Sequence, residues 1–189
     1  MTVVCETERL IVRHFALSDA PFIVRLLNQD SFIRYIADKN VRTEEDAINY
    51  LTQGPLASYA QYGFGLSLVM LKGCQTPIGM CGVLKRDELE HPDLGYAFLD
   101  EFVGKGYASE AAANTLISTM MQCELETVLA VTLNNNARSN KLLNTVALAC
   151  NAPLNCMALS IICTNIKPAK AKPKTSLFLR GFTPRAANS

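Results

Sequence analysis

The sequence predicts one α/β (α+β) domain whose strands and helices follow the order βααβββαβα. Short β-rich runs alternate with segments whose apolar residues recur at helical spacing. Two of these runs, 64–71 and 77–83, are separated by a short glycine-containing turn, which is typical of an antiparallel hairpin. The 189 residues are enough for one domain with a substantial core and few for two.

The N-terminal third of the chain predicts a strand followed by two helices. Residues 9–15 form a β-rich run, and Ser18-Asp19 then offers an N-cap for a helix with apolar residues at helical spacing over 22–27. Thr43 can cap a second helix, and we expect Gly54-Pro55 to end it. The elements predicted after this point are the hairpin strands 64–71 and 77–83, strand 94–99, a helix from about 107 to 121, strand 128–133 and helix 138–146.

The charges are distributed unevenly along the chain. The sequence carries 18 basic and 17 acidic side chains, for a net charge of +1. All the acidic residues lie between Glu6 and Glu126, and beyond Ala147 every charge is basic. A near-neutral total argues against a dedicated nucleic-acid-binding protein. The basic tail therefore either binds something negative or differs in origin from the body of the chain.

We expect a cytoplasmic protein with no membrane partner and no metal site. The start of the chain, with Glu6 and Glu8, lacks the basic and apolar runs of a signal peptide. No stretch approaches the roughly 18 uninterrupted apolar residues of a membrane span. The seven cysteines are odd in number and show neither CxxC nor Cys/His ligand spacing, so they predict neither a disulfide framework nor zinc.

Two glycines, Gly104 and Gly106, stand between strand 94–99 and the helix that follows it. Glycine permits positive φ and a close approach to the main chain. The first N–H groups of the helix make such a loop suitable for an anion such as a pyrophosphate, with Lys105 adding a positive charge. The loop is not a Walker A sequence, because Gly-Lys-Gly lacks the x-x-x-x-Gly-Lys-Ser/Thr frame. It is not a dinucleotide fingerprint either, because Ser109 stands where the third glycine is needed. An ordinary turn is the alternative.

Three motifs, taken in order and spacing, resemble the GNAT acetyltransferases. They are Asp93-Leu-Gly-Tyr-Ala-Phe-Leu99, Gly104-Lys-Gly-Tyr-Ala-Ser-Glu110 and Asn136-Ala-Arg-Ser139. The opening Thr7-Glu-Arg-Leu-Ile-Val-Arg13 is most similar to the ribosomal-protein N-terminal acetyltransferase subgroup. The resemblance covers about residues 6–146 and implies the GNAT fold, a mixed and mostly antiparallel central sheet flanked by helices.

The resemblance also implies an acetyl-CoA site. In the family, N–H groups of the glycine loop hold the pyrophosphate, and the main chain of the preceding strand pairs with the pantetheine arm. The matching residues here are Val103, Gly104, Lys105, Gly106, Tyr107 and Ala108 for the loop, and Tyr96, Ala97, Phe98 and Leu99 for the strand. Asn136 and Ser139 match side chains that lie near the arm and the thioester, although either residue can instead cap the last helix. Glu101 departs from the family, which has Gln or Arg at that position.

The implied activity is that of an acyltransferase in which a primary amine, on a protein N-terminus or a small molecule, attacks the thioester directly. Asp93 is the expected base, with Glu90 and His91 as rivals. Ser139 can donate to the leaving thiolate. Many family members use a tyrosine acid on the last helix, but Leu143 occupies that position here, so Ser139 or water must replace it. The expected partners are acetyl-CoA and an amine, with no nucleic acid, and the expected state is a monomer or homodimer.

The resemblance stops at Val146. The family pattern continues with Gly-Phe and two further strands, whereas this chain reads Ala147-Leu-Ala-Cys-Asn. When codons are re-formed from the third base of each codon and the first two of the next, Met157-Ala158 must give glycine and Val146-Ala147 can give glycine. One permitted reading then continues the family pattern. We therefore expect that a one-base deletion near codon 146 shifted the frame, and a genuine extension with a basic segment over 167–174 is the rival.

A shifted frame has consequences for the fold and for activity. We expect domain 1–146 to be followed by an atypical segment, 147–189, of which 167–189 is flexible. Residues 147–163 are apolar enough to form some strand, but the last strands of the family are altered and the sheet edge beside 128–133 is left uncovered. The second functional hypothesis is accordingly a catalytically impaired CoA-binding or interaction protein.

Overall fold

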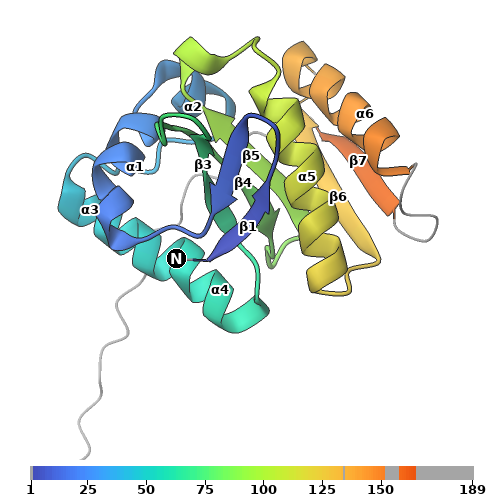
Figure 1. Ribbon diagram of the computed structural model, residues 1–189, viewed down its shortest axis with the longest axis horizontal. Coiled ribbons are helices and arrows are strands. Elements are labelled where there is room, and N and C mark those ends of the chain that lie inside the picture. Colours follow the sequence, from blue (N-terminus) through green and yellow to red (C-terminus); the bar gives the residue numbers. More distant parts are fainter. Residues whose placement is uncertain (1, 134, 152–157, 165–189) are drawn as a thin grey trace, which may run out of the picture.

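The computed structural model describes residues 2–133, 135–151 and 158–164, and within them the strands form one sheet with helices on both faces (Figure 1). The sheet runs in the order β1-β2-β3-β4-β5-β6-β7. The strands are β1 (Val3–Glu6), β2 (Leu10–Arg13), β3 (Leu66–Leu71), β4 (Pro77–Leu84), β5 (Asp93–Phe98), β6 (Thr127–Leu133) and β7 (Ala158–Thr164). The first four neighbouring pairs are antiparallel and the last two are parallel, which confirms the mixed, mostly antiparallel sheet.

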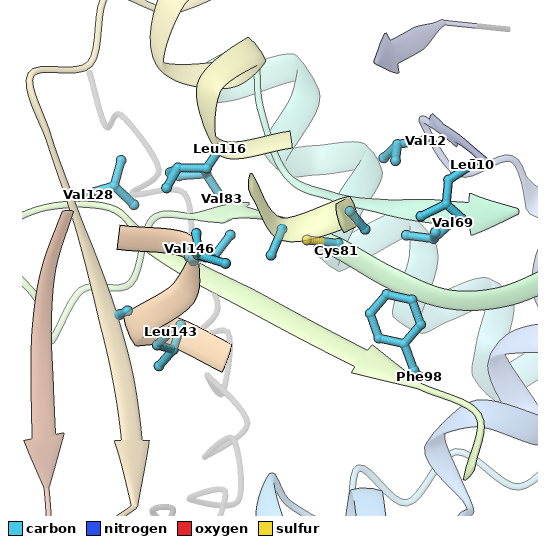
Figure 2. Packing of buried hydrophobic residues seen from close by; sticks show 14 of the residues in the cluster. Leu10, Val12, Val69, Cys81, Val83, Phe98, Leu116, Val128, Leu143 and Val146 are labelled. Carbon is cyan, nitrogen blue, oxygen red and sulfur yellow. The ribbon is translucent and has the colours of Figure 1, made fainter. Parts of the chain in front are cut away.

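The helices form two groups. The group on one face comprises α1 (Ala20–Leu27), α2 (Asp30–Tyr35) and α3 (Glu44–Leu51), and the group on the other comprises α5 (Tyr107–Gln122) and α6 (Ala137–Asn151). Each group of helices covers one hydrophobic core, and successive residues of β3 point to opposite cores. Leu68 packs in the first core, with α1 to α3, and Val69 packs in the second core, with α5 and α6. Figure 2 shows Leu143 and Val146 of α6 in the second core.

The predicted order βααβββαβα is present with further elements added to it. Strand 9–15 corresponds to β2, helices 22–27 and 43–51 to α1 and α3, and the later elements to β3, β4, β5, α5, β6 and α6. The sequence prediction missed β1 and α2, which are short and carry weak patterns. α6 runs to Asn151 and therefore passes the position where the family resemblance stops.

The prediction that Gly54-Pro55 ends a helix is wrong. A π-helical turn over Thr52–Leu56 carries the chain past both residues into α4 (Ala57–Tyr62). A wider turn tolerates the missing N–H and the ring of Pro55, which is buried. The helical segment ends instead at Gly63, whose φ of 78° is the left-handed conformation typical of a glycine after a helix.

The N-terminal ends of the first helices are fixed in different ways. Thr43 caps α3 as predicted, because its hydroxyl accepts from the N–H of Asp46 at 3.1 Å. Asp19 does not cap α1 with its side chain. Its carboxylate instead accepts two hydrogen bonds of 2.8 Å from the guanidinium of Arg13 and one from the N–H of Ala16. This buried ion pair joins the end of β2 to the start of the helical arm, which is the run of helices between β2 and β3.

The expectation of an uncovered edge beside 128–133 is wrong. β7 pairs with β6 in parallel register from Thr127↔Ala158 to Leu133↔Thr164, so the edge of β6 is covered. The segment 167–189, for which we predicted flexibility, lies outside the described residues. Within the described ranges, no helix is long and apolar enough to cross a membrane.

Candidate functional site

β5 and β6 part from each other soon after they meet. β5 pairs with β4 along its length, from Leu84↔Asp93 to Gly79↔Phe98, but among the described residues its one pairing with β6 is Asp93↔Leu129. Beyond that bridge the main chain of β5 has hydrogen-bonding groups on the β6 side that none of the described strands satisfies. An extended ligand with amide groups can pair with such an edge.

The direction of the main-chain groups along β5 decides which residues face this gap. The N–H of Leu99 donates to the carbonyl of Ile78 at 2.9 Å, so it points to β4. Because these groups alternate along a strand, Ala97 also faces β4, whereas Tyr96 and Phe98 face the gap. Of the four strand residues expected to meet a cofactor arm, Tyr96 and Phe98 are therefore the two with main-chain groups directed toward it.

The glycine loop at the end of β5 has the backbone that was predicted for it. Gly104 and Gly106 have φ of 83° and 82°, which a residue with a side chain adopts only with strain. Gly106 occupies the N-cap position of α5, a helix of 16 residues, and residues 103–106 are exposed. The first N–H groups of α5, from Tyr107 and Ala108 onward, thus begin at an open loop with the positive end of the helix dipole behind them.

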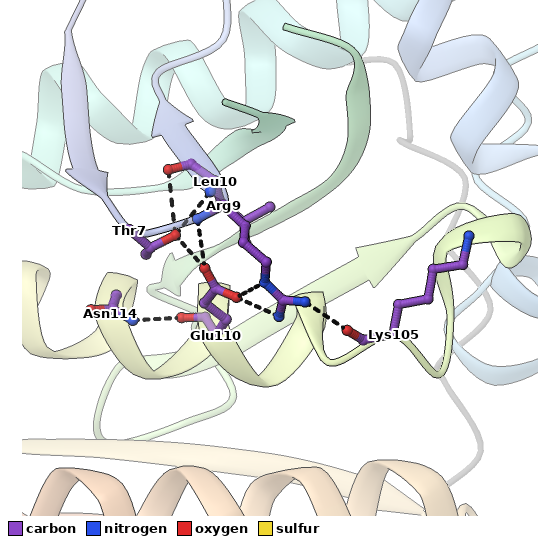
Figure 3. A network of polar contacts seen from close by, with 6 residues as sticks. All are labelled: Thr7, Arg9, Leu10, Lys105, Glu110 and Asn114. Carbon is purple, nitrogen blue, oxygen red and sulfur yellow. Dashed lines mark hydrogen bonds and ion pairs between the residues drawn. The ribbon is translucent and has the colours of Figure 1, made fainter. Parts of the chain in front are cut away.

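A polar network holds this loop from the β1–β2 turn (Figure 3). The Nε of Arg9 donates to Glu110 at 2.7 Å, and its Nη1 donates to the carbonyl of Lys105 at 3.1 Å. The guanidinium also lies 4.6 Å from the centre of the Tyr107 ring. Thr7 donates to the other carboxylate oxygen of Glu110 at 2.5 Å. Arg9 therefore joins the loop to the first turn of α5.

Glu110 is the acidic centre of this network. Burial alone would raise the pKa of its carboxyl, but the hydrogen bonds from Thr7 and Arg9 outweigh burial, so the pKa lies below its usual value. The charge of Glu110 thus stays on the carboxylate and is balanced by Arg9 at 2.5 Å. In the sequence the two residues belong to separate motifs, Arg9 to 7–13 and Glu110 to 104–110.

Glu101, which departs from the family pattern, has a partner on α1. Its carboxylate accepts from Arg25 at 2.8 Å, and the neighbouring N–H of Asp100 donates to Gln29 at 2.8 Å. These contacts connect the helical arm to the short helix Asp100–Phe102 that precedes the loop. The negative charge of Glu101 is thereby balanced beside the arm.

The start of α6 meets β5 on the face of the sheet that α5 and α6 cover. The side chain of Asn136 accepts a hydrogen bond from the N–H of Ser139 at 3.2 Å, so Asn136 caps this helix. Helix capping was the alternative to a role near the cofactor arm. The hydroxyl of Ser139 lies 2.7 Å from the phenolic oxygen of Tyr96. Leu143, one turn further on, is buried in the core and offers no polar group.

Asp93 lies where the two strands part and is 1% exposed. Burial raises the pKa of its carboxyl, Arg86 lowers it, and Glu88 raises it again, with a net increase. The Nε of Arg86 lies 2.9 Å from Oδ1, yet no hydrogen bond of good geometry reaches that atom among the described residues. The rivals Glu90 and His91 are exposed in the preceding loop.

Comparison with known proteins identifies the family. A family model for the acetyltransferase (GNAT) domain matches residues 9–147. This chain belongs to the GNAT family of acetyltransferases. The prediction made from its motifs is confirmed, and the observed sheet and helices are those of the GNAT fold.

Several individual proteins are also similar to this chain in sequence or in structure. The curated relative YoaA of Bacillus subtilis, an uncharacterized N-acetyltransferase, is 26% identical over 145 residues, covering 76% of this chain and 81% of the relative. The ribosomal-protein-S5-alanine acetyltransferase of Vibrio fischeri has a TM-score of 0.64 at 22% identity, covering 77% and 82% of the two chains. The microcin C7 self-immunity acetyltransferase MccE, solved with acetyl-CoA and AMP, has a TM-score of 0.62 at 18% identity, covering 76% and 78%.

The GNAT domain thus brings together groups that are far apart in its sequence. Asp93, Tyr96 and Ser139 border the gap, and the loop 103–108 lies at the other end of β5. Sequence reasoning missed the side chain of Tyr96 and the contacts of Arg9. The motif 7–13 pointed to Arg9, but its partners on α5 are visible only in the fold.

Proposed function

We propose that this GNAT domain transfers the acetyl group of acetyl-CoA to a primary amine, on a protein N-terminus or a small molecule, by direct attack on the thioester. The observation that carries the proposal is the parting of β5 and β6 beyond Asp93↔Leu129, with the glycine loop at one end of β5 and a buried carboxylate at the other. This arrangement has one place for an anion, one for an extended amide chain and one for a base.

The described residues suit acetyl-CoA in order along β5. The N–H groups of the loop 103–108 would receive the pyrophosphate, because both glycines hold the backbone open and α5 begins there. The main chain at Tyr96 and Phe98 would pair with the amides of the pantetheine arm. The capping of α6 by Asn136 uses its side-chain oxygen, which leaves its amide nitrogen to meet the arm. Acetyl-CoA supplies the activated acetyl group, and the proposal involves no metal.

Asp93 is the proposed base. It accepts a proton from the attacking amine, directly or through water, and its raised pKa brings it closer to the range that suits proton transfer near neutrality. As the C–S bond breaks, the hydroxyl of Ser139 donates a hydrogen bond to the sulfur anion. Holding the thioester and the amine together supplies much of the rate without further groups.

Cellular context follows from the same proposal. We place the protein in the cytoplasm, with acetyl-CoA and an amine as its partners. The described cysteines Cys5, Cys74, Cys81 and Cys123 are free thiols, which fits a reducing compartment.

Two measurements test the function. Acetyl-CoA is expected to raise the melting temperature of the folded protein, and a panel of primary amines is expected to cause release of CoA. Asp93→Asn should keep the thermal shift and lose the release. A folded protein with no acetyl-CoA protection would contradict the proposal, and binding without turnover for every amine would favour the impaired CoA-binding alternative.

The frame shift near codon 146 remains a proposal that a DNA sequence can test. The gene and its nearest relatives should differ by one base near this point, and relatives that carry the same tail in frame would contradict it. Acetyl-CoA binding is best compared between this chain and a variant with the frame restored. β7 covers β6 in the present chain, so we expect both to fold.

A further inference from the structure

A hydroxyl group of β5 meets a hydroxyl group from the first turn of α6. The phenolic oxygen of Tyr96 and the Oγ of Ser139 are 2.7 Å apart although 43 residues separate them in the chain. Tyr96 projects to the face of the sheet covered by α5 and α6, where it packs against the core cluster. Both side chains are half-buried, so packing restrains them while part of each remains accessible.

The acidity of the two groups sets the direction of this hydrogen bond. Either hydroxyl can donate in this hydrogen bond, and the greater acidity of a phenol than of an alcohol favours the Tyr96 O–H as the donor and the Ser139 oxygen as the acceptor. Burial raises the pKa of Tyr96 to about 12, with the hydrogen bond to Ser139 acting against it, so the phenol keeps its proton at neutral pH. Once Ser139 accepts from Tyr96, its own proton is left for a different acceptor.

The position of Ser139 is fixed from its backbone as well. Its N–H donates to the side chain of Asn136 at 3.2 Å, which holds the first turn of α6. The backbone of Ser139 is therefore held by a helix cap, and its oxygen is held by a phenol from β5. A serine held in this way has less rotamer freedom to lose when its hydroxyl proton meets an acceptor.

We propose that Tyr96 is a positioning residue, which donates to Ser139 so that the Ser139 hydroxyl proton is directed at the sulfur of CoA. This inference rests on the proposed function. It gives the side chain of Tyr96 a task that its main-chain role on β5 does not include. It also places a phenol beside the reaction although Leu143 occupies the usual tyrosine position on α6.

The step in which the pair acts is the collapse of the tetrahedral intermediate. The carbon–sulfur bond breaks, its electron pair stays on sulfur, and the amide product keeps the acetyl carbon. The sulfur anion accepts the hydrogen bond of Ser139, which the hydrogen bond from Tyr96 strengthens. No proton leaves Tyr96, because a thiolate is too weak a base to take one from this phenol. The sulfur later takes its proton from water.

The experiment measures the thiol pKa of CoA bound to the full-length protein, and it needs no acceptor amine. The ultraviolet absorbance of the thiolate is followed against pH, and the same titration of the complex with desulfo-CoA is subtracted to remove the protein cysteines. We expect the pKa of bound CoA to lie below that of free CoA. Tyr96→Phe should raise it by about half a unit to one unit, the range of a single hydrogen bond.

Matched variants separate positioning from a structural role. Ser139→Ala should raise the thiol pKa at least as much, and the double variant should equal Ser139→Ala alone, because Tyr96 acts through Ser139. Tyr62→Phe, at an exposed position of α4, should leave the pKa unchanged. If Tyr96→Phe does not fold, 3-fluorotyrosine at position 96 keeps the shape with a stronger acid and should lower the thiol pKa further.

The outcomes distinguish this inference from the proposed function. Failure of the wild-type protein to bind CoA would overturn both. If CoA binds and the thiol pKa is the same in the wild type and in Tyr96→Phe, or if the effects of the two single variants add, only the role of Tyr96 is overturned.

Discussion

The carboxylate of Glu110 accepts a hydrogen bond of 2.7 Å from Arg9, across 101 residues of chain. The same guanidinium reaches the carbonyl of Lys105 and covers the ring of Tyr107. One side chain at the β1–β2 turn thus determines how the glycine loop meets the first turn of α5. The loop itself is exposed, and this contact adds a tertiary link to the conformation that its glycines permit.

Replacing Arg9 should weaken the binding of CoA through the loop. We expect Arg9→Gln to raise the Kd for CoA about fivefold, the effect of losing a partly exposed ion pair worth about 1 kcal/mol. Isothermal titration calorimetry should show no such loss for pantetheine, which lacks the pyrophosphate. Arg42→Gln removes an exposed pair elsewhere and serves as the control. An equal loss for CoA and pantetheine would contradict a role in the loop.

The charge of Glu110 should make stability depend on pH in acid. Its pKa is lowered in the folded state, so its contribution is present above the unfolded pKa of about 4.3 and is lost as the pH falls through the folded pKa. Glu110→Gln should therefore lower the free energy of unfolding by up to about 1 kcal/mol at pH 7 and by less near pH 3. Urea denaturation at several pH values measures this, and a difference that grows toward acid would show the sign to be wrong.

The two loop glycines should resist substitution because of their backbone conformation. Gly104→Ala meets open space but retains a φ of 83°, so we expect it to cost about 1 kcal/mol. Gly106→Ala has the same strain, and its new Cβ would lie 3.3 Å from Arg9, so its cost should be somewhat larger. Gly73→Ala, which has open space and no positive φ, is the control and should be nearly neutral. Equal melting temperatures for all three would refute the strain.

Asp93→Asn should lower the activity without lowering the stability at pH 7. The raised pKa means that ionising this carboxyl becomes costly as the pH rises through the folded pKa, so the variant should equal or exceed the wild type in stability at pH 7. The difference should disappear below about pH 3.9, where both side chains are neutral. CoA release should fall by about 10²- to 10⁴-fold with an unchanged Kd for CoA. Asp87→Asn, in the exposed loop, should change neither property.

The buried pair of Arg13 and Asp19 should be needed for the fold of the helical arm. Arg13→Met leaves a buried carboxylate without its main partner, so we expect a loss of about 3–5 kcal/mol in the free energy of unfolding. Exchanging both residues for apolar ones should cost less than Arg13→Met alone, because no charge is then left unpaired. Thermal denaturation of the single and double variants decides this, and a double variant that is the less stable would contradict it.

The sequence by itself determined the elements with strong local signals. Hydrophobic periodicity located α5 and the hairpin of β3 and β4, and the glycines at 104 and 106 predicted the positive φ that both residues adopt. The capping of α3 by Thr43 was also a local matter. Patterns of this kind depend on neighbours in the chain, and the motifs they formed were enough to identify the GNAT family.

The tertiary structure decided every property that joins distant segments. The continuation of a helix past Pro55 depends on packing that offsets a poor local sequence. The pairing of β7 with β6, the hold of Arg9 on α5 and the meeting of Tyr96 with Ser139 each connect residues whose closeness no periodicity encodes. A hydrogen bond needs its two groups about 3 Å apart and aligned, and only the packed sheet and helices supply that geometry.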